Sequence, residues 1–189
     1  AAIDLVLDAY EAANSESSIA SSRWVIEHGF IPRSDQFPRM KDLGLTVSAQ
    51  NHLYLAAPSL IEYWGEERAA WTTPVRAYLD NGIPLSLGTD SPVVPYDPWW
   101  ALHHFTTRET ISSGVVGADQ RISRDEALRS ATEGYAYLTF SEDHRGTLSV
   151  GKLADFAVTA EDYLTCADPC LETMLIDITI VGGRIVWER

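Results

Sequence analysis

The stretch PLSLGTDSPVVPYDPWW, residues 84–100, begins as an apolar run, stops at the acid Asp90 and continues into a proline-rich segment with two tryptophans. An Asp before Ser-Pro is a common turn former, which is one interpretation of this stretch. The other interpretation is that a buried parallel strand ends at Asp90 and places its carboxylate at the rim of a barrel, where it holds a metal. The neighbouring segments bear on this choice.

Two further short apolar runs precede this stretch, at residues 24–26 and 45–49, and each ends in polar residues. The first ends in Glu27-His28-Gly29 and the second in Gln50-Asn51-His52. The patterns between and after these runs predict helices over residues 34–43, 58–70 and 74–81. Alternating strands and helices are typical of right-handed βαβ units and a parallel sheet. The sequence therefore predicts an α/β fold in which the polar strand ends share one edge.

The second half of the chain changes in character at Gly146. Before it, helices are predicted over residues 98–112 and from Ser123, where Ser123 and Glu126 form a capping box. After it, the pattern alternates, and Gly182-Gly183 favours a tight hairpin. We expect two parts, residues 1–145 as an α/β part and residues 146–189 as an antiparallel β tail.

Composition excludes several classes of function. The formal net charge is −13, with 14 basic residues among 27 acids, whereas a nucleic-acid surface needs clustered Lys and Arg. No apolar run approaches the roughly 20 residues of a membrane span, and no signal peptide is visible. We therefore expect no nucleic-acid or membrane partner and a cytoplasmic location. Cys166 and Cys170 are expected to be ordinary loop cysteines, with a short disulfide or a metal role as the alternatives.

His28 and Asp90 are the residues best placed for chemistry. Each ends a predicted parallel strand at the same rim, and neutral imidazole and carboxylate are ligands that a catalytic divalent metal uses. A buried, hydrogen-bonded histidine and a turn aspartate remain the alternative. The adjacent His103 and His104 point about 100° apart on a predicted helix, so we expect them to pack or cap, and we expect His144 to be a solvated loop residue.

Four segments resemble a known family: RWVIEHG, GTDSPV, EALRSATEGYAYLTFSEDHRGTLSVGKLADFAV and ITIVGGRIVWE. They look like the C-terminal half of the metal-dependent amidohydrolase superfamily, and within it the amidohydrolase-3 group of YtcJ-like enzymes and N-substituted formamide deformylases. The resemblance implies about strands six to eight of a (β/α)8 TIM barrel, followed by strands of a flanking β-sandwich. The G-x-L-x-x-G-K-x-A-D-F segment with its following V-x-G-G hairpin is the most specific part.

The resemblance also implies roles for individual residues. His28 matches a histidine metal ligand after the sixth strand, and Asp90 matches the acid that contacts the metal and serves as general base. Gln50 and His52 fall after the seventh strand, where such enzymes line their substrate pocket, and Trp99 belongs to a segment that could form an apolar wall. The implied cofactor is a divalent metal, with zinc as the expected ion, and the implied substrate is a small molecule with an amide-type C–N bond.

The chain also departs from the family. The H-x-H pair and the H-A-x-G-D histidine of the family are absent, and the opening helix AAIDLVLDAYEAAN has no N-cap residue before it. We therefore expect a C-terminal portion of a hydrolase that has little activity by itself. One alternative is a non-catalytic half-barrel that self-pairs into a homodimer, because a partial barrel exposes strand edges and apolar surface. Another is a metal-independent hydrolase that uses Glu27 and Asp90 as paired carboxylates.

Overall fold

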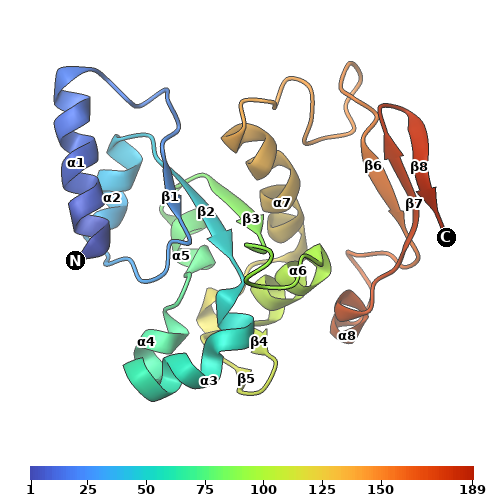
Figure 1. The fold of residues 1–189 in the computed structure, drawn as a ribbon, viewed down its shortest axis with the longest axis horizontal. Helices are drawn as coiled ribbons and strands as arrows, with labels where there is room; N and C mark the ends of the chain where they lie inside the picture. Colours follow the sequence, from blue (N-terminus) through green and yellow to red (C-terminus); the bar gives the residue numbers. More distant parts are fainter.

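The computed structural model describes residues 1–189 and has an α/β core followed by an antiparallel tail (Figure 1). The helices are α1 (Ala2–Glu16), α2 (Gln36–Asp42), α3 (His52–Trp64), α4 (Glu66–Ala70), α5 (Val75–Asp80), α6 (Pro98–Thr107), the 3-10 helix η1 (Ala118–Gln120), α7 (Arg124–Leu138) and α8 (Asp168–Glu172). The strands are β1 (Val25–Glu27), β2 (Thr46–Gln50), β3 (Leu85–Gly88), β4 (Glu109–Thr110), β5 (Gly114–Val115), β6 (Phe156–Thr159), β7 (Ile176–Val181) and β8 (Arg184–Glu188).

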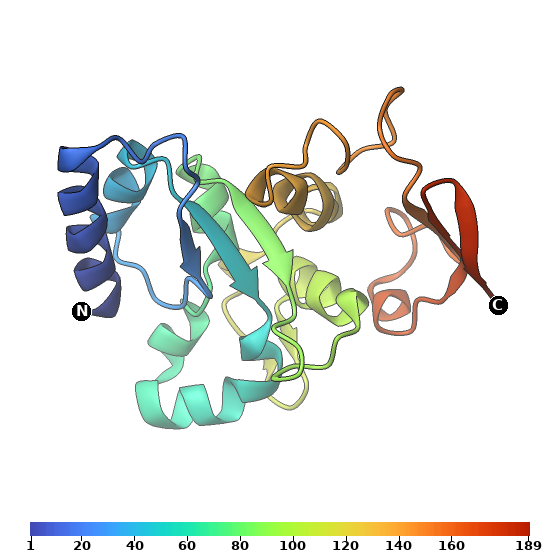
Figure 2. The same ribbon diagram turned by 45° about the horizontal axis from the view of Figure 1, so that its top comes forward.

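The core sheet has three parallel strands in the order β1-β2-β3. Figure 2 shows the three strands side by side, with their arrowheads pointing the same way. Val47 and Ala49 in the central strand are fully buried, which is expected when helices cover one face and packed side chains cover the other. The predicted parallel α/β arrangement is confirmed, and the carboxyl ends of all three strands lie at one edge.

Helix α7 packs directly on β3, and the contact depends on a glycine. A Cβ on Gly134 would lie 2.1 Å from the backbone oxygen of Leu85, which is closer than any real contact allows. The helix begins with the predicted capping box, in which Ser123 and Glu126 each bond the other's backbone. Close backbone approach therefore holds α7 against the strand that leads to Asp90.

Helix α6 is shorter than the sequence predicts. It ends at Thr107 rather than near residue 112, because Arg108 takes a left-handed conformation with φ 58°. The Arg108 side chain is fully buried and donates hydrogen bonds to backbone oxygens of Val116 and Thr72, among others. The hydrogen bonds of the guanidinium group hold the turn at which the helix ends, and residues 109–115 form the small β4–β5 hairpin instead of a further helical turn.

The start of α3 also differs from the prediction. The helix begins at His52, directly after β2, and Pro58 lies inside it rather than at its first turn. It ends at Trp64, and Gly65, with a φ of 80°, separates α3 from α4. The first turn of α3 therefore lies at the same edge of the sheet as the polar residues that end β2.

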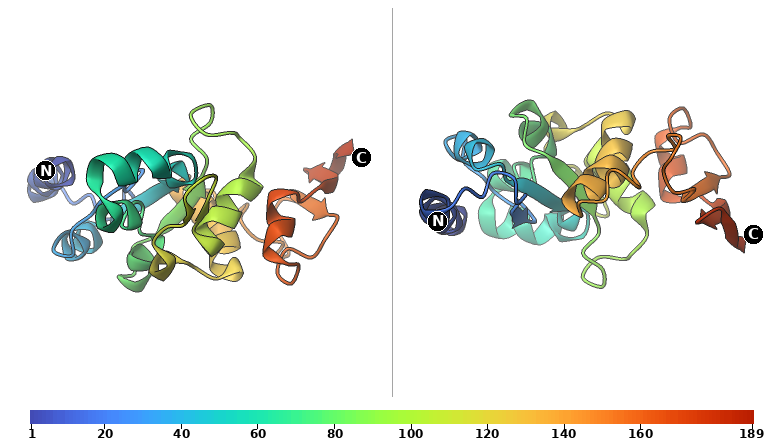
Figure 3. Two further views of the ribbon diagram at one scale, coloured as in Figure 1. Left: turned by 90° about the horizontal axis from the view of Figure 1, so that it is seen from below. Right: turned by 90° about the horizontal axis from the view of Figure 1, so that it is seen from above.

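The C-terminal tail is a three-stranded antiparallel sheet in the order β6-β7-β8. Gly182 and Gly183, with φ of 57° and 76°, form the predicted tight turn between β7 and β8. In both views of Figure 3 this sheet lies at the end of the molecule opposite α1. Tyr163 and Leu171, between β6 and β7, belong to the main hydrophobic core, so the tail is tied to the α/β part. The division at residue 146 stays a prediction.

Cys166 and Cys170 are joined in a disulfide, with their Cα atoms 6.2 Å apart. The favoured interpretation of the pair as ordinary loop cysteines is therefore wrong, because α8 brings the two residues within bonding distance of each other. None of the helices combines the length and the apolar character that a bilayer crossing requires.

Candidate metal centre

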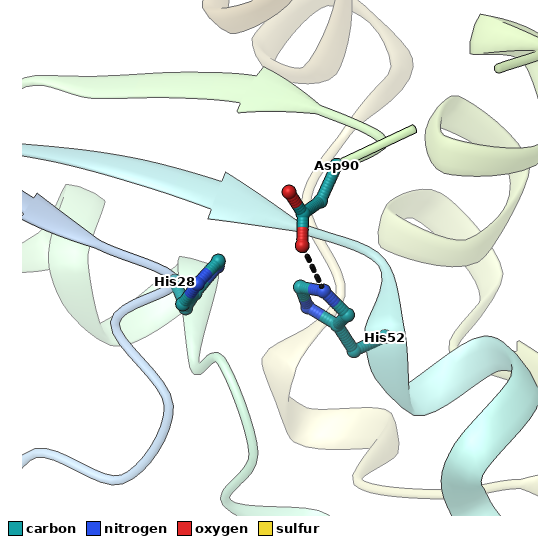
Figure 4. Close-up of side chains that lie close together, drawn as sticks. All are labelled: His28, His52 and Asp90. Atoms are coloured by element: carbon teal, nitrogen blue, oxygen red, sulfur yellow. Dashed lines mark hydrogen bonds and ion pairs between the residues drawn. The ribbon is translucent and has the colours of Figure 1, made fainter. Parts of the chain in front are cut away.

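Three polar side chains converge where the parallel strands end (Figure 4). His28 directly follows β1, His52 begins α3 after β2, and Asp90 comes two residues after β3. Each offers one potential ligand atom, and these atoms all lie within 4.8 Å of one another. The parallel register accounts for this meeting, because neighbouring parallel strands end at the same edge. His28 and Asp90 therefore lie together, as the sequence predicts.

The backbone at two of these residues is unusual. His28 has φ 66° and Asp90 has φ 57°, both in the left-handed region that non-glycine residues seldom adopt. Such conformations cost free energy, and they cluster at functional sites where the surrounding structure holds them. At His28 the surroundings include the backbone N–H, which donates to the Ser48 oxygen at 2.8 Å. Both side chains are thus directed by backbone geometry as well as by packing.

His52 and Asp90 contact each other directly. The Nε2 atom of His52 lies 2.9 Å from Oδ2 of Asp90, and Figure 4 shows the carboxylate pointing toward the imidazole. The His52 side chain is 12% exposed and that of Asp90 is 37% exposed. The buried Nδ1 atom of His52 has no hydrogen-bond partner. The carboxylate is therefore accessible, while the imidazole keeps one unsatisfied nitrogen.

His28 is held by an amide from the neighbouring strand. Its Nδ1 atom lies 2.7 Å from Oε1 of Gln50, the last residue of β2. The Gln50 amide nitrogen in turn donates to Ser48 Oγ at 2.8 Å and to Glu27 Oε2 at 3.4 Å. Gln50 thus lies beside the cluster, where the sequence predicts it, but its amide forms hydrogen bonds with other side chains of the protein.

The donor set fits a divalent metal. Two imidazoles and one carboxylate are a common ligand set for catalytic zinc, which leaves further positions for water or substrate. Two donors each about 2.05 Å from a tetrahedral zinc ion are roughly 3.3 Å apart. The 2.9 Å separation of His52 Nε2 and Asp90 Oδ2 is close to that requirement. A metal bound through Nε2 would place the His52 proton on the buried Nδ1 atom, which has no hydrogen-bond partner.

Phe30 lies against both imidazoles and was not predicted from the sequence. Its ring centroid is 5.7 Å from that of His28 and 5.2 Å from that of His52. The two imidazoles themselves meet edge to face, with centroids 5.0 Å apart. In the sequence, the only feature that could have indicated a role for Phe30 is its position two residues after His28. An apolar ring beside the cluster lowers the exposure of the imidazoles and limits how they turn.

The tryptophans lie in the first turn of α6, where the Asp97 side chain accepts from the Trp99 backbone N–H. The Trp99 ring contacts Tyr163 at 5.9 Å, and the Trp100 ring contacts Tyr54 at 5.6 Å. These half-buried contacts hold α6 to neighbouring helices and to the tail. The predicted role of Trp99 in substrate binding stays a prediction.

His103 and His104 are buried and belong to the packing of α6, as the sequence predicts. His103 Nε2 lies 3.1 Å from Glu109 Oε2, and His104 Nδ1 lies 2.8 Å from the Glu109 backbone oxygen. Burial lowers the pKa of His104 to about 3, with the nearby Arg108 charge acting in the same direction. His104 is therefore a neutral core residue at physiological pH. His144 is exposed in a loop, again as predicted.

Comparisons with known proteins agree with this arrangement. A model of the amidohydrolase family matches residues 1–187. The chain is 34% identical to N-substituted formamide deformylase of Arthrobacter pascens over all of its own length and 35% of that protein. It spans about a third of the length of the curated relatives it matches.

Two solved structures are similar in fold and in sequence. A metal-dependent hydrolase of Pyrococcus horikoshii superposes with a TM-score of 0.75 at 28% identity, over 89% of this chain and 33% of that one. A metal-dependent hydrolase of Pyrococcus furiosus superposes with a TM-score of 0.63 at 36% identity, over 80% of this chain and 29% of that one. Both of these proteins are described as hydrolases that depend on a metal.

Proposed function

Because the chain belongs to the amidohydrolase family, we propose that it is the C-terminal portion of a metal-dependent hydrolase acting on C–N bonds other than peptide bonds. In this proposal β1, β2 and β3 are the sixth, seventh and eighth strands of a (β/α)8 barrel, and β6 to β8 belong to a flanking β-sandwich. The parallel order and the shared carboxyl edge support this assignment.

The convergence of His28, His52 and Asp90 carries the proposal. Three residues from three separate strand ends bring their potential ligand atoms within 4.8 Å of one another, and two of these residues adopt left-handed backbone conformations. A turn aspartate and an isolated core histidine would not require this meeting. We therefore assign the three side chains as donors to one divalent cation, with zinc as the ion that suits two imidazoles and a carboxylate.

A divalent cation bound there would supply a Lewis acid and lower the pKa of a coordinated water. The chain's own contribution is to hold and move a proton at the Asp90 carboxylate. At 37% exposure this carboxylate is open to water, and contact with His52 fixes its orientation. Asp90 accepts the proton of the attacking water and later donates it to the leaving nitrogen.

The substrate class rests on similarity to a relative. The relative from Arthrobacter pascens is described as a deformylase of N-substituted formamides. We propose a small amide-type substrate for this chain, with Phe30 as an apolar surface beside the reacting group. The loop after Asp90, which projects from the molecule in Figure 3, exposes further apolar side chains, with Val93 66% and Tyr96 82% exposed.

Zinc titration of the 189-residue chain tests the proposed site. In competition with a chromophoric chelator, His28→Gln, His52→Gln and Asp90→Asn should each weaken zinc binding by more than about tenfold, because each removes one of three donors. His144→Gln, which changes an exposed loop histidine, should leave the affinity unchanged. Equal affinity in all four variants would contradict the assignment.

Catalysis by the chain alone is expected to be weak. Three donors at one edge of a three-stranded sheet leave the substrate largely open to water, whereas hydrolysis benefits from a closed, preorganised site. A formamide hydrolysis assay on the isolated chain should therefore stay near the uncatalysed rate. Zinc-dependent turnover by the chain alone would contradict this expectation.

A second candidate function is self-association through the C-terminal sheet, favoured by its exposed apolar residues. Ile185 and Val186 in β8 are 60% and 59% exposed, and Trp187 beside them is 47% exposed. Neighbours on one strand face opposite sides, so apolar surface is open on both faces of this sheet. Sedimentation should show a dimer that Ile185→Lys weakens, and a monomer at all concentrations would exclude this function.

A further inference from the structure

Gln50 ends the central strand beside the metal centre and is only 7% exposed. Its side chain reaches the ring of His28 on one side and the Ser48 and Glu27 side chains on the other. Every polar atom of the amide is therefore engaged with protein groups. A residue so occupied offers little to a substrate, and its role has to be sought in what it holds.

The partners of the amide determine which way it points. A carboxylate has only acceptor oxygens, so the group facing Glu27 Oε2 must be the amide nitrogen, which donates. The same nitrogen donates to Ser48 Oγ at 2.8 Å. The amide oxygen is left to face His28 Nδ1 at 2.7 Å, and since an oxygen only accepts, Nδ1 must carry the proton.

This proton position has a consequence for metal binding. A neutral imidazole with its proton on Nδ1 has its lone pair on Nε2, and the lone pair is what binds a metal. Metal-binding histidines generally donate their other N–H to a fixed acceptor, which sets the ring orientation and raises the basicity of the ligand. In this chain the acceptor is a neutral amide, so the His28 ring is oriented without a further negative charge next to it.

We propose that Gln50 is a positioning residue that holds His28 in the tautomer with the proton on Nδ1 and presents Nε2 to the metal. This inference deepens the proposed function and rests on it for the role of His28. The chain of contacts runs from Glu27 through Gln50 to His28, across the β1–β2 pair in which Glu27 lies opposite Ser48. Glu27 therefore helps to orient the Gln50 amide, a role that differs from the catalytic one it has in the paired-carboxylate alternative.

The test is the tautomer of His28 in the metal-free chain, read from nitrogen-15 NMR of the histidine rings. The wild-type chain should show the proton on Nδ1. Gln50→Met keeps the length of the side chain and removes the acceptor, so the ring should shift toward the form with the proton on Nε2. Zinc affinity should fall by about 10–100-fold in the same variant.

A swapped pair separates loss of the acceptor from loss of packing. In E27Q/Q50E a carboxylate accepts from His28 Nδ1 and an amide donates to that carboxylate, so the two contacts are kept with the partners exchanged. The tautomer and the zinc affinity should return to near their wild-type values. If Gln50→Met does not fold, the swapped variant alone still decides, because a proton found on Nε2 there would overturn the proposal.

Failure of this inference is distinguishable from failure of the proposed function. A wild-type His28 with its proton on Nε2, or a tautomer unchanged in Gln50→Met, overturns the role of Gln50 whatever zinc does. Zinc affinity unchanged in His28→Gln overturns the metal site whatever the tautomer is. The tautomer is measured in the absence of metal, and the zinc affinity of His28→Gln is measured with Gln50 unchanged.

Discussion

Replacing His104 by Gln should make the fold less sensitive to acid. The His104 side chain is fully buried, and burial lowers its pKa to about 3 from its ordinary value of 6.5. Below pH 6.5 the unfolded chain binds a proton at this imidazole, whereas the folded chain does not until about pH 3. The free energy of unfolding therefore falls as the pH falls through this window.

The size of the effect follows from the width of the window. Each pH unit between the two pKa values changes the free energy of unfolding by about 1.4 kcal/mol. Between pH 6.5 and pH 4 the wild-type chain should therefore lose about 3 kcal/mol at this residue, and His104→Gln should not. Glutamine can still donate to the Glu109 backbone oxygen that His104 Nδ1 contacts at 2.8 Å.

Urea unfolding followed by tryptophan fluorescence, repeated from pH 7 to pH 4, measures the difference. Carboxylates titrate in the same range in both proteins, so the difference between the wild type and His104→Gln isolates the imidazole. His144→Gln is the matched control and should follow the wild type, because it leaves His104 in place. Parallel pH profiles for the wild type and His104→Gln would refute the assignment of His104 as a neutral core residue.

Three further predictions follow from the contacts. Gly134→Ala should lower the free energy of unfolding by about 1–3 kcal/mol despite the better helix propensity of alanine, because the added Cβ would meet the Leu85 oxygen. Thr132→Ala, on the exposed face of α7, is the control and should not lower it. Thermal melts compare the two variants. Arg108→Met should lower the free energy of unfolding by at least about 3 kcal/mol in urea titrations, since buried backbone oxygens lose their donors, and a smaller loss would show that water replaces the guanidinium. In the full-length enzyme Asp90→Asn should reduce kcat by about 100-fold or more even with zinc saturating, because an amide cannot accept the proton; an unchanged kcat would remove Asp90 from catalysis.

The sequence predicts the parts of the structure that depend on local patterns. Apolar runs ending in polar residues identify the three parallel strands, and the spacing of Ser123 and Glu126 identifies the start of α7. It also places His28 and Asp90 at one edge, because parallel strands end together. These features require only periodicity, capping chemistry and the rule that neighbouring parallel strands share an edge.

The remaining features depend on contacts between distant residues. The early end of α6 follows from Arg108, whose partners lie more than 30 residues earlier in the chain as well as in the next hairpin. The contact of Gln50 with His28 spans 22 residues, and no local signal tells such an amide from a pocket-lining one. Side-chain partners of this kind are set by tertiary packing, which a single sequence does not display. The disulfide is different, because it joins cysteines four residues apart and depends on the local backbone at the start of α8.

A crystal structure of this chain grown with zinc, with anomalous scattering recorded at the zinc absorption edge, tests the three-donor site most directly. We expect one strong peak about 2.0–2.2 Å from a nitrogen of His28, a nitrogen of His52 and an oxygen of Asp90, at the carboxyl edge of β1, β2 and β3. A zinc peak bound elsewhere, or none at this edge under saturating zinc, would contradict this assignment.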